Sequence, residues 1–133
     1  DVCSSDLFFG MASKPGNQEI LENLGARSPT VTVFFTVLFA PIFEELFFRG
    51  LLFARLFRAN FAVAAYLLSS LLFALMHEPS PTNGILDWLL KLTLYGLMGA
   101  AFASVCRKTG KLWPAILAHA SNNLLGMVVV LLS

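Results

Sequence analysis

The sequence predicts an all-α membrane protein: a polytopic bundle of about four transmembrane helices, preceded by a short interfacial helix at the N-terminal end. Of its 133 residues, 57% are hydrophobic and 13% are charged, and the mean hydropathy is +0.75. Soluble domains average about 45–50% apolar and about 25% charged residues. The apolar residues form runs of about 20 residues, which is the length that crosses a bilayer as a helix.

Charge and cysteine usage exclude other classes of protein. The net charge of +1 provides no basic surface for nucleic acid. Cys3 and Cys106 are far apart and lack CxxC or Cys/His spacing, so the sequence predicts neither a disulfide framework nor a zinc finger.

The N-terminal segment, residues 1–29, differs from the core that we expect over 30–133. The chain begins at Asp1 and ends inside an apolar run, so we expect it to be a fragment of a longer membrane protein. Residues 7–12 are apolar but too short to span, and we interpret them as the remnant of a lost helix. An interfacial helix is predicted to end near Gly25, because apolar residues recur at helical spacing at Ile20, Leu21 and Leu24.

Four spanning helices are predicted in the core. The first covers about 30–57 and contains Pro41, a residue that kinks helices. The second covers about 60–77, the third about 85–106, and the fourth runs from about 113 to the end. The third helix carries small residues that let neighbouring backbones approach closely: Gly96, Gly99, Ala100, Ala101 and Ala103.

Loop charges predict how the bundle is oriented. The loops at 55–60 and 106–111 lie on the same side of an up-down bundle, and both carry Lys or Arg residues. The loop at 78–84 carries Glu78 and has no Lys or Arg. The positive-inside rule therefore places the first two loops in the cytoplasm.

An acidic pair lies at the centre of the first predicted helix. Each ionised side chain at the bilayer centre costs about 2.5–3.5 kcal/mol on insertion scales, so such residues usually mark function. Glu45 and Arg49 are four residues apart, which favours an ion pair along the helix. Glu44 points about 100° away and lacks this partner, so it is the free carboxylate and the candidate general base. The alternative is a buried ion network that only holds helices together.

Two histidines and an amide lie in the other apolar runs. His77 ends the second helix, where a histidine is often a cap that complements the helix dipole. His119 and Asn123 are four residues apart and share a helix face, where they could form an interhelical hydrogen-bond clamp. At a rise of 1.5 Å per residue, Glu44 and His77 lie about 20 and about 25 Å from one loop and His119 about 12 Å from the other. These depths allow a shared polar pocket, with the two histidines as the least well matched pair.

Two mechanisms fit this set of side chains, and the sequence does not separate them. In the first, Glu44 and a histidine activate a water that attacks a peptide carbonyl, while the other histidine and Asn123 donate hydrogen bonds to the oxyanion. In the second, Glu44, His77 and His119 hold a divalent metal such as zinc, which lowers the pKa of bound water. Signatures of serine hydrolases and of HExxH zinc proteases are not found.

Three motifs in order resemble the CPBP intramembrane proteases, a family that contains CAAX prenyl endopeptidases and bacterial Abi proteins. They are Glu-Glu-x-x-x-Arg at Glu44, Phe-x-x-x-His ending at His77, and His-x-x-x-Asn starting at His119. The resemblance covers about residues 30–127 and implies a membrane endopeptidase of the bacterial plasma membrane. Descriptions of the family differ on whether it depends on a metal.

The resemblance also implies roles for the site residues. Glu44 and His77 would activate water, and His119 and Asn123 would stabilise the oxyanion. The candidate catalytic residues are therefore Glu44, Glu45, His77, His119 and Asn123, with Arg49 in support.

The expected partners follow from this function. They are the lipid bilayer and a peptide or protein substrate in or near it, without nucleic acid. Two other functions would use the same buried polar residues: a non-catalytic membrane partner of the bacteriocin-immunity type, and a proton or ion carrier in which Glu44 titrates.

Overall fold

The computed structural model describes residues 28–81 and 84–132, and every regular element in these ranges is a helix. The predicted all-α class is therefore confirmed. The predicted helix remnant and interfacial helix lie outside the described residues.

The first predicted helix is a continuous helical rod, Thr30–Arg58. Along its length α-helical and wider π-helical turns alternate: α3 Pro29–Val33, η1 Phe34–Phe39, α4 Ala40–Glu45, η2 Leu46–Phe53 and α5 Ala54–Arg58. Pro41 lacks an N–H, and its ring would clash with the carbonyl four residues earlier in a regular α-helix. A π turn precedes Pro41 in the rod, and in it the Ala40 N–H bonds to the Phe35 carbonyl. The chain thus remains helical through Pro41.

The remaining helices start and end close to the predicted positions. A tight turn at Asn60, with φ of 63°, leads into α6 Ala62–His77. Next come α7 Ile85–Thr109 and α8 Trp113–Leu132. Gly110 ends α7 in the left-handed conformation, with φ of 65°, and its N–H bonds to the Cys106 carbonyl. Glycine adopts this conformation without the steric cost that a Cβ imposes.

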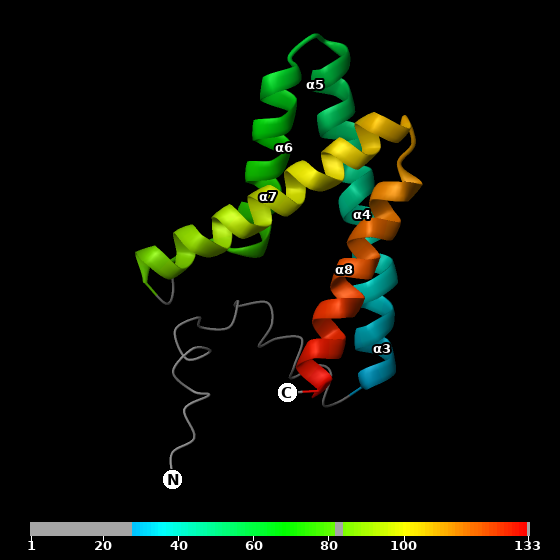
Figure 1. The fold of residues 1–133 in the computed structure, drawn as a ribbon, viewed down its shortest axis with the longest axis vertical. Coiled ribbons are helices and arrows are strands. Elements are labelled where there is room, and N and C mark those ends of the chain that lie inside the picture. Colours follow the sequence, from blue (N-terminus) through cyan, green and yellow to red (C-terminus); the bar gives the residue numbers. More distant parts are fainter. Residues whose placement is uncertain (1–27, 82–83, 133) are drawn as a thin grey trace.

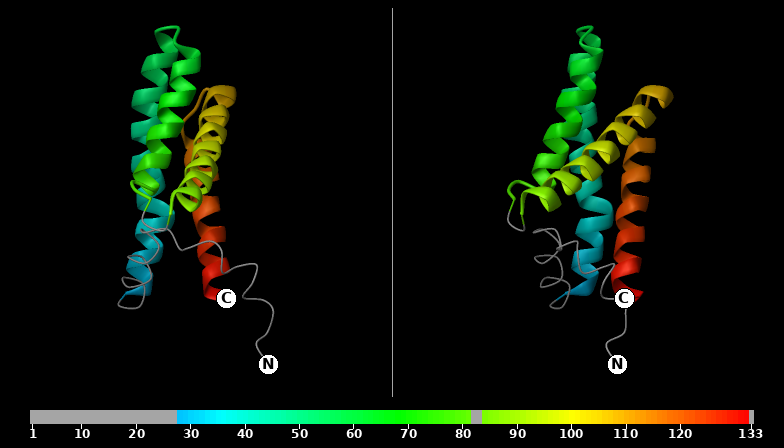
Figure 2. Two further views of the ribbon diagram at one scale, coloured as in Figure 1. Left: turned by 90° about the vertical axis from the view of Figure 1, so that its left-hand side faces the viewer. Right: turned by 60° about the vertical axis from the view of Figure 1, so that its left-hand side comes forward.

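The helices pack as two antiparallel pairs joined by an oblique crossing (Figure 1). The α5–α6 hairpin extends beyond the connection between α7 and α8 along the long axis. Helix α7 crosses α6, and α8 returns beside η1 and α4. The two further views in Figure 2 show the same side-by-side placement of α8 and the lower part of the rod.

The crossing of α6 and α7 depends on Gly99. A Cβ built on Gly99 would lie 3.0 Å from the Ser70 Cα and 3.3 Å from Nη2 of Arg49. The predicted role of small residues in close helix approach is therefore confirmed at this position. A buried apolar cluster lies next to the crossing and consists of Phe48, Phe73, Phe102 and Ala115.

Two stretches of the described residues are long and apolar enough to cross a membrane. They are Thr30–Arg58, with a mean hydropathy of 1.8, and Ile85–Thr109, with a mean hydropathy of 1.6. The apolar α6 is shorter, with 16 residues. Many large apolar side chains on the outer surface are exposed, such as Phe43 at 56% and Leu97 at 65%. These features fit a lipid-facing surface, while the predicted number of four spans stays a prediction.

Candidate functional site

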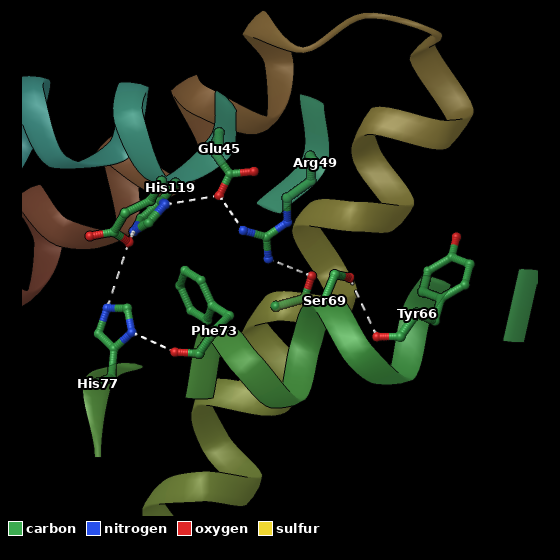
Figure 3. Close-up of polar contacts among 9 residues, drawn as sticks. Glu45, Arg49, Tyr66, Ser69, Phe73, His77 and His119 are labelled. Atoms are coloured by element: carbon green, nitrogen blue, oxygen red, sulfur yellow. Dashed lines mark hydrogen bonds and ion pairs between the residues drawn. The ribbon is translucent and has the colours of Figure 1, made fainter. Parts of the chain in front are cut away.

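The predicted ion pair of the first rod is present and completely buried. Nη1 of Arg49 donates to Oε1 of Glu45 at 2.7 Å, and both side chains have 0% exposure. Nη2 of Arg49 donates to the Gly99 carbonyl on α7 at 2.8 Å. Figure 3 shows the guanidinium directed from the rod toward the neighbouring helices. The charge pair therefore also ties the rod to α7.

Three phenylalanine rings surround the guanidinium of Arg49. The distances from its Cζ atom to the ring centroids are 4.7 Å for Phe73, 5.4 Å for Phe102 and 5.7 Å for Phe48. A cation gains energy over the face of an aromatic ring, and more so away from water. Because these rings replace water around the charge, Glu45 is its essential ionic partner.

His119 extends this network to α8. Its Nδ1 lies 3.0 Å from Oε1 of Glu45, and its side chain is 1% exposed. A carboxylate can only accept, so Nδ1 carries the proton. The ring also stacks on Phe102, with centroids 4.8 Å apart and planes 15° apart. These contacts fix the imidazole so that Nε2 faces Oε2 of Glu44 at 3.7 Å.

His77 approaches the same carboxylate from α6. Its Nδ1 lies 2.9 Å from the Phe73 carbonyl one turn earlier, so Nδ1 donates here as well. Its Nε2 lies 3.8 Å from Oε2 of Glu44 (Figure 3). The ring thus bonds a carbonyl of the last helical turn, as the capping interpretation predicts, and also faces the carboxylate.

Glu44 is the point at which the two imidazoles meet. Its side chain is 20% exposed, and its Oε2 is buried without a hydrogen-bond partner among the described residues. Distances of 3.7 and 3.8 Å to the two Nε2 atoms are too long for direct hydrogen bonds. Polar contacts of this length are commonly bridged by water. The predicted convergence of Glu44, His77 and His119 is therefore present.

Asn123 lies one turn after His119 on α8 and contacts the first rod. Its Nδ2 donates to the Thr36 carbonyl at 2.9 Å. This bond is the interhelical clamp that the sequence allowed as an alternative to an oxyanion role. An amide nitrogen has two N–H groups, so one further hydrogen remains for another acceptor. The oxyanion role of Asn123 stays a prediction.

The side chains around Glu44 are of the types that bind divalent metals, but they do not form a ready metal site. Within 28–81 and 84–132, no group of three or more His, Cys, Asp or Glu side chains is arranged to hold a metal ion.

Sequence reasoning missed the residues of α7 that line the site. Tyr95 stacks on His77, Gly99 accepts from Arg49, and Phe102 stacks on His119. Their spacing of four and three residues places them on one helix face. That spacing is a weak signal, because aromatic residues in an apolar helix usually serve as packing.

Two comparisons with known proteins bear on this site. The family model for type II CAAX prenyl endopeptidases, Rce1-like, matches residues 26–125. The chain is 28% identical over 115 residues to the "Putative membrane peptidase YdiL" of Bacillus subtilis (strain 168). This alignment covers 86% of the chain and 43% of that relative, so the chain spans less than half of its length. No solved structure matches the chain.

The family match covers the rod, α6, α7 and the part of α8 that carries His119 and Asn123. Together with the two long apolar helices, it identifies an integral membrane protein. It also confirms the resemblance to the CPBP intramembrane proteases. The chain belongs to the Rce1-like family of type II CAAX prenyl endopeptidases.

Proposed function

We propose that this chain carries the catalytic core of an intramembrane endopeptidase that hydrolyses a peptide bond with a water activated by Glu44 and His77. The observation that carries the proposal is the position of Oε2 of Glu44, buried and without a hydrogen bond, between the Nε2 atoms of two histidines. Glu45 and the Phe73 carbonyl occupy both Nδ1 atoms. Both reactive ring nitrogens are therefore directed at one point.

The first step is attack by water. A water between Glu44 and His77 donates one hydrogen to each, and Glu44 takes a proton as the water oxygen bonds to the peptide carbonyl carbon. The carbonyl oxygen becomes an oxyanion, which accepts hydrogen bonds from the second N–H of Asn123 and from His119, whose Nε2 must carry a hydrogen in order to donate. Glu45 holds the ring through Nδ1.

The second step breaks the peptide bond. Glu44 returns its proton to the amide nitrogen as the carbon–nitrogen bond breaks, which releases a carboxylic acid and an amine. This scheme routes no step through a metal. In this scheme Glu45 and Arg49 hold His119 and the rod in place, and they do not contact the reacting atoms.

The substrate that fits this position is a peptide segment of a protein in or next to the bilayer. Glu44 lies near the middle of a 29-residue apolar rod, so the scissile bond has to reach membrane depth. We further propose that the protein resides in a bacterial plasma membrane with the loops at 55–60 and 106–111 in the cytoplasm, since both loops carry basic residues.

Cleavage of a peptide library by the full-length protein in detergent tests the proposal. Glu44→Gln should lower kcat about 100- to 10,000-fold, the usual contribution of a general base, and leave the protein folded. Glu78→Gln is the matched control, because Glu78 is 4% exposed and lies outside the mechanism. Unchanged cleavage by Glu44→Gln would contradict the proposal. A biological effect that survives this substitution without any cleavage would favour the non-catalytic partner.

A chelator series addresses the metal. We expect cleavage to persist after treatment with 1,10-phenanthroline and dialysis, because the scheme needs only water and side chains. Loss of activity that zinc restores would replace the water-only mechanism with a metal-dependent one.

A further inference from the structure

Tyr95 contacts the imidazole that has the fewest other supports. Its ring stacks on His77, with centroids 4.6 Å apart and planes 25° apart. Apart from Nε2, which faces Glu44 at 3.8 Å, the other contacts of the His77 ring come from Phe73 on the same helix, through the carbonyl at 2.9 Å and the ring at 4.4 Å. Tyr95 belongs to α7, so it constrains His77 from a second helix.

The end of α6 makes that support necessary. His77 is the last helical residue, and the next residue, Glu78, leaves the helix with φ of −130° and ψ of 78°. Helix ends fray and lack the full set of backbone hydrogen bonds. The hydrogen bond and the ring contact to Phe73 move with the end of the same helix, and Glu44 lies beyond hydrogen-bond distance. A partner on α7 fixes the ring relative to the rest of the bundle.

The two histidines are supported in parallel ways by α7. Phe102 stacks on His119 as Tyr95 stacks on His77. Tyr95 and Phe102 are seven residues apart, which is two helical turns, so both rings extend from one face of α7. Helix α7 contacts both helices that carry the two histidines, α6 and α8, and Figure 1 shows it crossing α6 obliquely. One helix thus supplies one aromatic plate for each imidazole.

We propose that Tyr95 is a positioning residue that holds Nε2 of His77 toward Glu44 by ring stacking. The inference rests on the proposed function and adds a residue to it. Stacking uses the ring face and not the hydroxyl. Phenylalanine at position 95 should therefore preserve the function of Tyr95. Leucine is apolar but has no ring to stack, so it should not.

The kinetic test compares variants of the full-length protein. Tyr95→Leu should lower kcat about tenfold with little change in KM, while Tyr95→Phe retains activity within about twofold. The matched control is Tyr66→Leu, since Tyr66 is the other tyrosine of the chain and packs edge-on to Phe53, at 5.0 Å and 79°, away from His77. Tyr66→Leu should leave kcat unchanged.

Three kinetic results would overturn the inference. They are wild-type kcat for Tyr95→Leu, equal losses for Tyr95→Phe and Tyr95→Leu, and a loss of the same size for Tyr66→Leu. The second result would assign the effect to the hydroxyl, and the third to general packing.

NMR of the histidine rings provides a readout that does not depend on cleavage. The protein is labelled at histidine, and the His77 signals are assigned with His77→Gln. A ring proton over the face of Tyr95 is shielded, so Tyr95→Leu should move the His77 ring signals to lower field and leave those of His119 in place. Unmoved His77 signals would refute the stacking role even if cleavage is never detected. Absence of cleavage in the wild type, with the shift observed, would count against the proposed function alone.

Discussion

Two neighbouring glutamates of one helix have opposite surroundings. Glu45 has 0% exposure, and its Oε1 accepts from both Arg49 and His119 at 2.7 and 3.0 Å. Glu44 is 20% exposed and has an Oε2 atom that lies 3.7 Å or more from both histidines. In the closed network of Glu45, Arg49 and His119 the side chains are linked at hydrogen-bond distance, although Oε2 of Glu45 is buried without a partner. Glu44 instead lies beyond hydrogen-bond distance of both histidines. The difference shows how a buried network can hold the carboxylate next to it in place.

The largest expected effect comes from breaking the closed network. Arg49→Met should destabilise the protein by about 3–5 kcal/mol, because it leaves Glu45 as an unpaired buried charge. Unfolding by SDS titration in mixed micelles measures this loss. The double variant Glu45→Gln, Arg49→Met should recover part of the loss, since no unpaired charge remains. Equal stability of Arg49→Met and wild type would show that the network does not hold the fold.

The histidines separate the two regions more finely. His119→Gln should cost about 1–3 kcal/mol of stability, because Glu45 loses a buried donor, and should also lower kcat about 100-fold or more. His77→Gln should lower kcat with a loss of stability below about 1 kcal/mol, because its hydrogen bond stays within one helical turn. Cleavage assays and SDS titration of the same preparations check both. Equal stability losses would contradict the division between the regions.

Gly99 probes how the closed network is attached to α7. Gly99→Ala should cost about 1–3 kcal/mol, since its Cβ would lie 3.0 Å from the backbone of Ser70 and overpack the crossing. Gly96→Ala is the control, because a Cβ there meets nothing within 4 Å. Thermal unfolding in detergent, followed by circular dichroism, compares the two. The comparison fails if Gly96→Ala destabilises as much as Gly99→Ala.

The smallest expected effect concerns Glu78, which follows the end of α6. Burial raises the pKa of this carboxyl, and the charge of Lys91 opposes the rise. A raised folded-state pKa means that stability is greatest when Glu78 is protonated and falls as the pH rises through that pKa. Glu78→Gln should therefore stabilise the protein by about 0.5–1 kcal/mol at neutral pH.

The pH profile provides the check on Glu78. The difference between Glu78→Gln and wild type should vanish when the pH falls below the ordinary glutamate value of about 4.3. Thermal unfolding measured at several pH values gives this profile. A difference that grows at low pH would reverse the assigned sign.

The sequence allowed the helices and the converging polar side chains to be predicted, because polar residues stand out in apolar membrane-spanning segments. The predicted 30–57 is the rod Thr30–Arg58, and the predicted 60–77 is α6 Ala62–His77. The Glu45–Arg49 pair could be predicted because it is local, four residues apart on one helix. Charged and imidazole side chains in apolar runs have few uses other than meeting each other.

What could not be predicted depends on how helices sit against one another. The depth estimate placed His77 and His119 at different levels because it assumed loops at equal height, whereas the α5–α6 hairpin extends beyond the α7–α8 connection (Figure 1). Tyr95 and Phe102, which stack on the two histidines, could not be recognised from the sequence because they lie among other apolar residues. Their role appears only once α7 is placed across the bundle.

The spacing of Arg49 and Glu45 has a consequence for biogenesis. The two partners lie on the first described helix and pair within one turn, so this pair can enter the bilayer without net charge while later helices are still being synthesised. The Gly99 carbonyl and His119 belong to segments that emerge afterwards and complete the network. Insertion order along the nascent chain therefore matches the order in which this buried charge acquires its partners.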